Sequence, residues 1–584
     1  MITEQTKMGA ILKNESARAC LVRAFPFLDE EKHLLFIYKT MKLGEFLDSR
    51  VRLGFAMEQR AVLADELRGL PEIAEPGAGG SADGHPLQYT AADAEGRVLL
   101  SPEFAPQWEV FELQLEGPSA GNPYIEVELG AVFSRAGEDR TVKVDGFYEG
   151  NGYYRVRFMP DSEGEWHYRT FSSVSGLSSH EGDFFCTAPL AGVHGPVRVS
   201  NTFHFSYADG TPYLPVGTTC YVWTHQEESV EEATLESLKD SPFNKIRMCV
   251  FPKSYLYNRN EPQRYPFAGS LESGWDFEVF NPDFFEHLER RIAGLGRLGI
   301  EADLILMHPY DKWGFSEMDR AADERYLRYI IARLGAFRNV WWSLANEYDL
   351  MWAKTDEDWE YFGTLVQAND PYPHLLSNHN CLAFYDHDKP WISHCSLQRV
   401  DVYKTSEATT EWRQRWNKPV VIDECAYEGD IDQGWGNITG EEMTRRFWEG
   451  FVRGGYVGHG ETYMNSEELL WWSKGGELTG TSPARIAFLR KMIEESPAGY
   501  WEPLPSDWDL PCAGIDQEYY IYYFGFNQPR FRNFHFKPGV QYAVEIIDTW
   551  NMTISKELEL KEGSFRVDLP ARQYMAVRFT RQLP

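Results

Sequence analysis

Two short apolar segments of the sequence end in a carboxylate. Residues 339–349, NVWWSLANEYD, begin with an aromatic and β-branched run that suits a strand buried on both faces, and the run stops at Asn346 and Glu347. Residues 418–430, KPVVIDECAYEGD, repeat the pattern and reach Glu424. A lone strand that ends in Glu is usually structural. The two segments therefore gain meaning only if a fold brings the strand ends together.

Such a fold is predicted between residues 200 and 500, where short apolar strands alternate with amphipathic helices, as in βα units. In chain order, the expected strands are 213–223, 243–251, 301–308, 340–347, 374–378, 392–397, 419–424 and 456–463. Helices are expected at 282–298, 321–334, 357–367, 411–416, 441–453 and 483–495, and the unit after the fifth strand is poor. Eight units in about 300 residues predict an α/β fold built on one (β/α)8 TIM barrel.

In this barrel Glu347 ends the fourth strand and Glu424 ends the seventh. Active sites of such barrels lie at the carboxyl ends of the strands, so both side chains can point into one pocket. Two carboxyl groups about 5 to 5.5 Å apart are what a retaining glycosidase requires, one as nucleophile and one as general acid and base. This chemistry needs no cofactor.

The rest of the chain predicts accessory domains. Residues 1–75 show helical periodicity, for example at 30–41 and 53–67, and predict a small helical domain; residues 76–100, rich in Gly, Pro and Ala, predict a linker or loop. Alternating apolar and polar runs predict an immunoglobulin-like β-sandwich at 101–192 and a second β-sandwich at 505–584. The helical or sandwich domains could support a homo-oligomer.

The amino-acid composition limits the classes of molecule that the protein is expected to bind. The formal net charge of −31 disfavours nucleic acid and anionic membrane surfaces, whereas 19 Trp, 31 Tyr and 36 Phe suit the faces of sugar rings. No apolar run reaches the ~18 residues of a membrane span and the first residues lack a signal-peptide pattern, so a cytoplasmic location is expected. The eight cysteines show no CxxC spacing, and no standard ligand pattern predicts a metal.

Three segments of the first predicted sandwich, NPYIEVELGAVFS, VDGFYEGNGYYRVRFMP and EGEWHYRTFSS, resemble the N-terminal sandwich of a group of bacterial glycoside hydrolases. Residues 519–550 are similar to the C-terminal β-domain of that group. The Asn-Glu at the end of strand four and the Glu at the end of strand seven resemble clan A of the (β/α)8 glycoside hydrolases. The resemblance implies that Glu347 is the acid/base, Glu424 the nucleophile, Asn346 a ligand of the sugar 2-hydroxyl and Arg247 the cation that keeps the nucleophile ionised.

Other residues at the predicted barrel mouth are weaker candidates. His308 resembles a sugar-binding His of the clan, with a structural hydrogen bond as the alternative. His394 and Gln398 bracket the end of the sixth strand, from which the clan usually sends a Tyr or His to the nucleophile. No Tyr is present there, so the residue in that role stays open. Glu461 and Tyr463 close the eighth strand. Glu461 is the main competitor for a catalytic carboxylate, but its position on the strand favours binding of a sugar hydroxyl. Trp223, Trp313, Trp435, Trp471 and Trp472 could stack on sugars or fill cores. Strand alternation turns Asp423 toward the helices.

These observations predict a retaining glycoside hydrolase, with an exo-acting β-glycosidase that trims plant-derived oligosaccharides as the first interpretation. An endo-acting hydrolase with an open cleft is one alternative. A non-catalytic carbohydrate-binding protein on a degenerate barrel is the other, although such barrels usually lose one of the two carboxylates and both are present here.

Overall fold

The computed structural model describes residues 2–6, 8–25, 28, 42–44, 46–47, 57–70, 95–401 and 403–582. The chain divides into two compact units, residues 1–90 with 347–355, and residues 91–346 with 356–584. The first unit contains the helices α1 (Met8–Lys13), α2 (Glu15–Ala24) and α6 (Met57–Arg68). Asn14 caps α2 by accepting a hydrogen bond from the amide of Ala17. The helix predicted at 30–41 and residues 76–94 of the predicted linker lie outside the described residues.

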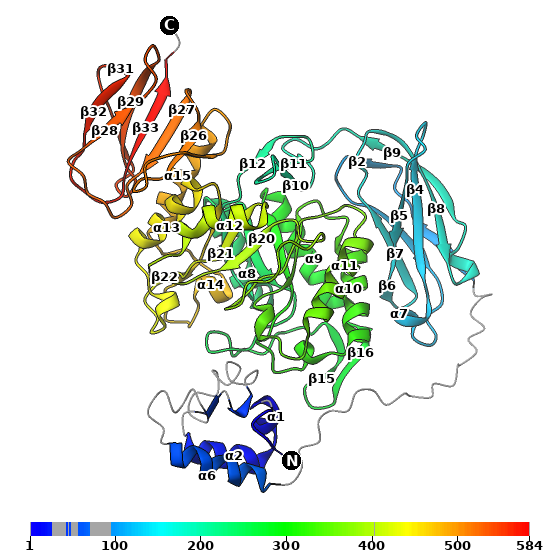
Figure 1. Cartoon of the computed structure of the whole chain (residues 1–584). Helices are drawn as coiled ribbons and strands as arrows, with labels where there is room; N and C mark the ends of the chain where they lie inside the picture. The colour runs from blue at the N-terminus through cyan, green and yellow to red at the C-terminus, as the bar shows by residue number, and fades with distance from the viewer. Residues whose placement is uncertain are drawn as a thin grey trace. The chain divides into compact units, whose positions relative to one another are not determined.

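Eight parallel strands form the barrel of the second unit (Figure 1). They are β13 (Gly217–Thr219), β14 (Lys245–Cys249), β17 (Glu301–Met307), β18 (Val340–Ala345), β19 (Leu376–Ser377), β20 (Cys395–Gln398), β21 (Val420–Glu424) and β23 (Tyr456–His459). Neighbours pair in the order β19-β18-β17-β14-β13-β23-β21-β20. At the seam between β19 and β20, the amide of Ser393 donates to the carbonyl of Leu376 at 2.9 Å. The predicted TIM barrel is confirmed.

Helices follow the barrel strands: α8 (Glu228–Lys239), α9 (Pro282–Arg297), α10 (Arg320–Leu334), α11 (Asp356–Asn369), α12 (Thr409–Trp416), α13 (Gly440–Val452) and α15 (Ser482–Glu494). Side-chain caps set two of the starts, because Asp319 accepts from the amide of Ala322 before α10 and Thr439 accepts from the amide of Glu442 before α13. Residues 378–394, between β19 and β20, contain no helix. The weak fifth unit of the sequence is therefore a real feature of the barrel.

The first barrel strand is shorter than predicted. Pro212–Tyr213 forms β12 of a small antiparallel sheet with β10 (Val197–Ser200) and β11 (His204–Tyr207), and the barrel strand begins only at Gly217. Pro215 lies between them and cannot donate a backbone hydrogen bond, which explains the interruption. Phe205 of β11 packs on Trp341 and Tyr456, so the small sheet closes the amino-terminal end of the barrel.

Two facing sheets precede the barrel. One consists of β1 (Arg97–Leu100), β3 (Phe111–Glu116), β7 (Tyr153–Phe158) and β6 (Phe147–Gly150), and the other of β2 (Phe104–Pro106), β9 (Glu181–Thr187), β8 (Gly164–Ser172), β4 (Leu129–Arg135) and β5 (Thr141–Asp145). A buried ion network joins this domain to the barrel helices: Arg157 contacts Glu289 at 3.0 Å, and Arg333 contacts Glu149 at 3.0 Å. Its orientation on the barrel is therefore fixed by charge pairs as well as by apolar packing.

A second sheet domain follows the barrel and is drawn in orange and red in Figure 1. Its main sheet contains β25 (Pro503–Leu504), β26 (Cys512–Ile515), β27 (Tyr519–Tyr523), β33 (Met575–Arg581), β29 (Gln541–Asp548), β30 (Thr553–Lys556) and β31 (Lys561–Glu562), and a second sheet pairs β28 (Phe531–His535) with β32 (Ser564–Asp568). Phe534 and Phe579 meet between the sheets with ring centroids 4.7 Å apart. The barrel with flanking sheet domains matches the predicted fold class.

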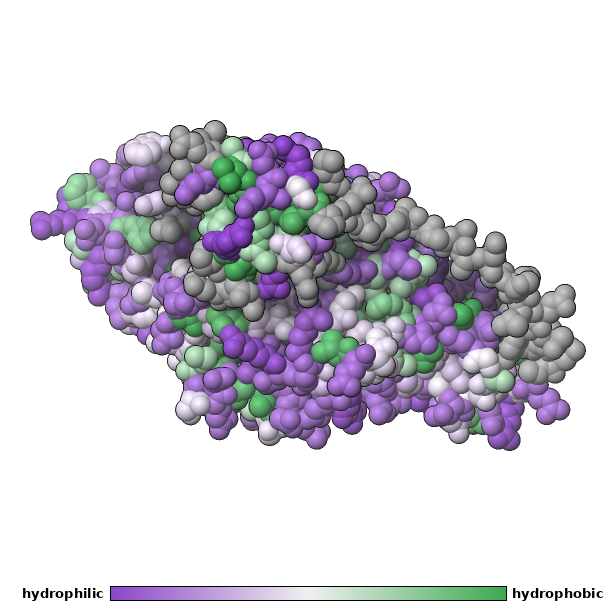
Figure 2. Space-filling view, turned by 90° about the horizontal axis from the view of Figure 1, so that it is seen from below, coloured by the Kyte–Doolittle hydropathy of each residue, from purple (hydrophilic) through white to green (hydrophobic). Residues whose placement is uncertain are grey.

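The molecular surface agrees with the composition. On the face shown in Figure 2, hydrophilic residues predominate among the coloured ones and hydrophobic residues are scattered. In the part of the chain that the structure describes, no helix combines the length and apolar character needed to cross a bilayer.

Candidate active site

Glu424, the last residue of β21, is held by a cation and a hydroxyl group. Nη1 of Arg247, from β14, lies 2.9 Å from its Oε1 atom, and the hydroxyl of Tyr221 donates to the same oxygen. Arg247 is 1% exposed and Glu424 is 5% exposed. Because both neighbours stabilise negative charge in a poorly solvated place, this carboxylate is suited to act as an anion.

Asp423 lies inside the barrel, so the prediction that it faces the helices is wrong. Its carboxylate accepts from Nζ of Lys245 at 2.9 Å and from Oγ of Ser396 at 2.6 Å. The reason is a β-bulge: Leu397 pairs with Ile422 and Gln398 pairs with Glu424, which leaves Asp423 as an extra residue. The bulge breaks the alternation of faces on which the prediction rested.

Beneath Glu424, three buried charges form a second layer. Lys245 lies between Asp423 and Asp303, whose Oδ2 atom is 2.5 Å from Nζ. Burial opposes ionisation of Asp423, but Lys245 and Arg247 outweigh it and lower the pKa of this carboxyl below its usual value. The layer anchors the part of β21 that presents Glu424.

Asn346 and Glu347 follow directly after β18, at its carboxyl end. Oδ1 of Asn346 lies 3.2 Å from the Tyr221 hydroxyl, so Tyr221 contacts both this amide and Glu424. Glu347 is 5% exposed and has a left-handed backbone conformation, with φ 55° and ψ 56°. Such a conformation is uncommon for a non-glycine residue and is concentrated at functional sites. A 3-10 turn, Tyr348–Leu350, begins immediately after it.

Aromatic side chains gather beside Glu424. Six of them form what we call the aromatic cluster: Tyr221, Tyr255, Tyr257, Tyr427, Trp435 and Trp472. Trp472 lies at its centre, with ring centroids 5.3 Å from Tyr221, 5.5 Å from Tyr427 and 4.7 Å from Trp435. Tyr255, Tyr257 and Trp435 are only half-buried. Their partly exposed rings are suited to the apolar face of a sugar.

Two residues near Glu424 were missed by sequence reasoning. The resemblance to clan A predicts a partner for the nucleophile on the sixth strand. The hydroxyl that donates to Glu424 instead belongs to Tyr221, two residues beyond the first strand. His379, two residues beyond β19, has its Nε2 atom 3.9 Å from Oε1 of Glu424, outside hydrogen-bond distance. A polar or aromatic residue just after each strand is the signal that could have found both.

His308 follows β17 and makes a structural hydrogen bond, since its Nε2 lies 3.1 Å from the carbonyl oxygen of Phe251. Burial, with the charge of Lys253 as a smaller cause, lowers the pKa of His308 to about 3. The imidazole is therefore neutral at physiological pH.

Three other predicted contacts are placed away from the barrel mouth or within the core. His394 precedes β20 and packs on Trp341 with ring centroids 5.3 Å apart, at the amino-terminal end of the barrel; it is not at the strand end where it was predicted. Trp223 is fully buried with Nε1 against Sδ of Met248, and Trp471 is buried with Nε1 donating to Thr218 at 2.8 Å. Neither of these two indoles offers a ring face to a ligand.

The remaining candidates are used in contacts within the protein. Trp313 is 4% exposed and donates from Nε1 to Glu261 at 3.0 Å. The Glu461 carboxylate is 1% exposed and accepts from the amides of residues 479 and 480, and the Tyr463 hydroxyl lies 3.3 Å from Glu428. Trp472, in contrast, belongs to the aromatic cluster beside Glu424.

Comparison with protein families gives three matches along the chain. Residues 200–502 match the family described as "Apiosidase-like, catalytic domain". Residues 105–173 and 508–580 match two families that are each described as a domain of unknown function, DUF5060 and DUF5605. No curated protein matches the chain.

Two solved structures illustrate its similarity to other proteins. A candidate glycoside hydrolase from Bacteroides vulgatus ATCC 8482 is 39% identical with a TM-score of 0.78, and the match covers 82% of this chain and 100% of that one. A family 5 glycoside hydrolase from the same organism is 14% identical with a TM-score of 0.54, over 66% of this chain and 94% of that one. The second match bears on the fold alone.

Proposed function

The chain belongs to the apiosidase-like catalytic-domain family and is a glycoside hydrolase, and on that premise we propose that it cleaves β-glycosides with retention of configuration. The observation that carries the proposal is the pair of donors, Arg247 and Tyr221, on one oxygen of Glu424. A glycosidase nucleophile must be ionised before it attacks, and a guanidinium at 2.9 Å favours that state.

In the proposed mechanism, Glu424 attacks the anomeric carbon while Glu347 gives a proton to the leaving oxygen. Water then attacks the glycosyl-enzyme, Glu347 accepts the proton of that water, and the bond to Glu424 breaks. The assignment of Glu347 is supported by its place directly after the fourth barrel strand and by its left-handed backbone. Two displacements at one carbon restore the original configuration.

Asn346 is proposed to hydrogen-bond the sugar 2-hydroxyl. Its Oδ1 is 3.2 Å from the Tyr221 hydroxyl, and the same hydroxyl donates to Glu424. A single side chain therefore links the amide to the proposed nucleophile. A contact at the 2-position strengthens as the transition state forms and adds to the rate. The half-buried rings of the aromatic cluster would bind the sugar face.

For the substrate, we propose terminal sugars on plant-derived oligosaccharides, removed in the exo mode. The family's description adds a terminal apiosyl group to the sugars to be tested. An endo-acting hydrolase remains the second candidate. Incubation with a long oligosaccharide separates the two modes, since exo action releases monosaccharides from the start and endo action accumulates products of intermediate length.

The catalytic assignment is tested with aryl β-glycosides of apiose, xylose, arabinose, glucose, galactose, mannose and fucose. On any accepted substrate, Glu424→Ala should lower kcat by at least about 10^3-fold, because no covalent intermediate can form. Azide added to this variant should restore turnover and give a glycosyl azide of opposite configuration. Asp430→Asn, at an exposed acid in the same segment, is the matched control and should retain activity. Undiminished hydrolysis by Glu424→Ala would refute the assignment.

A further inference from the structure

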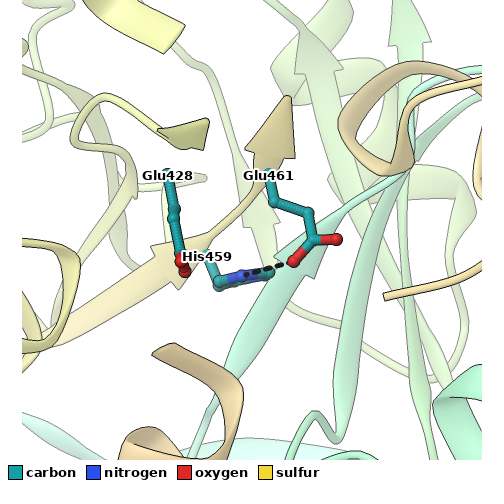
Figure 3. Close-up of side chains that lie close together, drawn as sticks. All are labelled: Glu428, His459 and Glu461. Carbon is teal, nitrogen blue, oxygen red and sulfur yellow. Dashed lines mark ion pairs between the residues drawn. The ribbon is translucent and has the colours of Figure 1, made fainter. Parts of the chain in front are cut away.

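A second group of buried ionisable residues includes Glu428, which is four residues beyond Glu424 in the sequence. Glu428 is in β22 (Glu428–Gly429), His459 ends β23 and Glu461 begins β24 (Glu461–Thr462); we call them the Glu-His-Glu cluster. Figure 3 shows the imidazole with a carboxylate on either side. All three residues are at most 1% exposed, and one ligand atom from each lies within 4.8 Å of the others. The parallel pairing of β22 with β24 places Glu428 opposite Glu461.

Backbone amides stabilise both carboxylates of the cluster as anions. Glu461 accepts from the amides of Thr479 and Gly480 at 2.5 and 2.8 Å. Glu428 accepts from the amides of Thr481 and Ser482 at 2.7 and 2.9 Å. These four consecutive residues lead into α15. Hydrogen bonds to the charged form favour ionisation, but burial outweighs them at Glu461 and raises its pKa to about 7. The fold thus brings two carboxylates side by side in the interior, where a second negative charge is unfavourable without a cation.

Within the described residues, no lysine or arginine forms an ion pair with either carboxylate. The arrangement differs from that of Glu424, which has the guanidinium of Arg247. Two neighbouring buried anions without a cation are costly, because their repulsion adds to the loss of hydration. The cluster therefore requires positive charge from a ligand or a proton.

The unused nitrogen of His459 points to the kind of ligand. Its Nδ1 lies 3.0 Å from Oγ1 of Thr218, an atom that already accepts from the indole of Trp471 at 2.8 Å. Its Nε2 is buried, has no hydrogen-bond partner in the described part of the chain and lies 4.0 Å from Oε2 of Glu461. With the proton on Nδ1 donated to Thr218, Nε2 directs a lone pair at the space between the carboxylates. Metal-binding histidines are oriented in this way by a partner on their other nitrogen.

We propose that one divalent transition-metal ion, Zn²⁺ or Mn²⁺, binds the Glu-His-Glu cluster through Glu428, His459 and Glu461. One imidazole and two carboxylates are suitable ligands for these ions, and the charge of the ion balances that of the carboxylates. A Cβ atom at residue 480 would collide with the Glu461 carboxylate, so Gly480 is needed for the close approach of this loop. The ion has a structural role: it joins the ends of β22, β23 and β24 to the loop before α15.

The test uses the full chain without a polyhistidine tag, stripped with a chelator and dialysed against micromolar Zn²⁺ or Mn²⁺. Elemental analysis should find about one ion per chain, and the unfolding midpoint should rise by about 5 °C or more because the ion binds the folded state. Less than about 0.1 ion per chain with an unchanged midpoint for both metals would overturn the proposal. A proton shared by the carboxylates would then be the counter-charge.

Variants locate the ion. Glu461→Gln keeps an oxygen for the amides but loses the charge, and His459→Gln removes the imidazole lone pair; both should lower binding by at least about tenfold and abolish the midpoint shift. Glu301→Gln changes another buried glutamate, outside the cluster, and should keep one ion. If one ligand variant does not fold, the other and the wild-type titration decide the result. One ion per chain retained in a folded ligand variant would contradict the site.

Discussion

Glu424 and Glu428 are four residues apart, and both are buried carboxylates near the ends of barrel strands, yet they are stabilised differently. Glu424 contacts a guanidinium and a phenol, whereas Glu428 accepts from the amides of Thr481 and Ser482. A side-chain cation thus faces Glu424, the proposed nucleophile. Backbone amides instead hold Glu428 beside Glu461, in the cluster that we propose binds a metal ion.

The largest loss of activity is expected when the cation beside Glu424 is removed. Arg247→Leu removes the cation from Glu424, and we expect kcat/KM to fall by about 10^3-fold. Arg328→Leu, which removes a surface ion pair with Glu324, is the control and should leave kcat/KM unchanged. An undiminished kcat/KM in Arg247→Leu would contradict the role of the guanidinium.

The layer beneath Glu424 gives the next largest effect, on stability. Lys245→Met leaves Asp303 and Asp423 buried without their shared cation, and should lower the free energy of unfolding by about 3 to 5 kcal/mol in urea titrations. Lys239→Met removes an exposed lysine that pairs with Glu236 and should leave the transition unchanged. Equal transitions for the two variants would show that the buried lysine is dispensable.

A smaller effect is expected at the phenol. Tyr221→Phe keeps the ring in the aromatic cluster and removes the hydroxyl from Glu424 and Asn346, so kcat should fall about 10- to 100-fold and less than in Arg247→Leu. The matched variant is Tyr213→Phe, whose hydroxyl donates to the carbonyl of Asn244 away from the site. A loss in Tyr213→Phe as large as that in Tyr221→Phe would indicate general damage to the barrel.

Glu301 is a third buried carboxyl, but in the described part of the chain it has neither an ion pair nor hydrogen bonds from backbone amides. Burial raises its pKa to about 8, against weaker opposing effects of the Trp341 indole and two arginines. A carboxyl whose folded pKa exceeds its unfolded value stabilises the fold below the unfolded pKa and loses that contribution as pH rises through the folded one. The unfolding free energy of Glu301→Gln relative to wild type should therefore increase by roughly 1 kcal/mol per pH unit between pH 5 and 8. A pH-independent difference would show that Glu301 is ionised throughout.

The barrel could be predicted because its strands are buried on both faces and are read as short apolar runs between amphipathic helices. The placement of Glu424 at the end of a barrel strand followed from that count, whereas Arg247 lies in the middle of β14. The inward turn of Asp423 could not, since a bulge depends on the register with Gln398 in a neighbouring strand. The position of His394 depended on where β20 begins, and element boundaries are the least predictable feature of a sequence.

The contacts of Glu424 and the Glu-His-Glu cluster were hidden for a related reason. Tyr221 follows the first strand, where no motif marks it, and it reaches Glu424 because β13 and β21 both pair with β23. Glu428, His459 and Glu461 lie up to 33 residues apart, and strand pairing rather than spacing brings them together. Local sequence patterns do not show which distant strands pair, so neither set of contacts could be predicted from them.

The most direct test of the central claim is to trap the covalent intermediate. The chain is incubated with a 2-deoxy-2-fluoro β-glycoside of the accepted sugar, carrying a good leaving group, and peptides are analysed by mass spectrometry. We predict one glycosyl group per chain, attached to Glu424, and product of retained configuration by NMR. A label on another carboxylate, or a product of inverted configuration, would contradict the account.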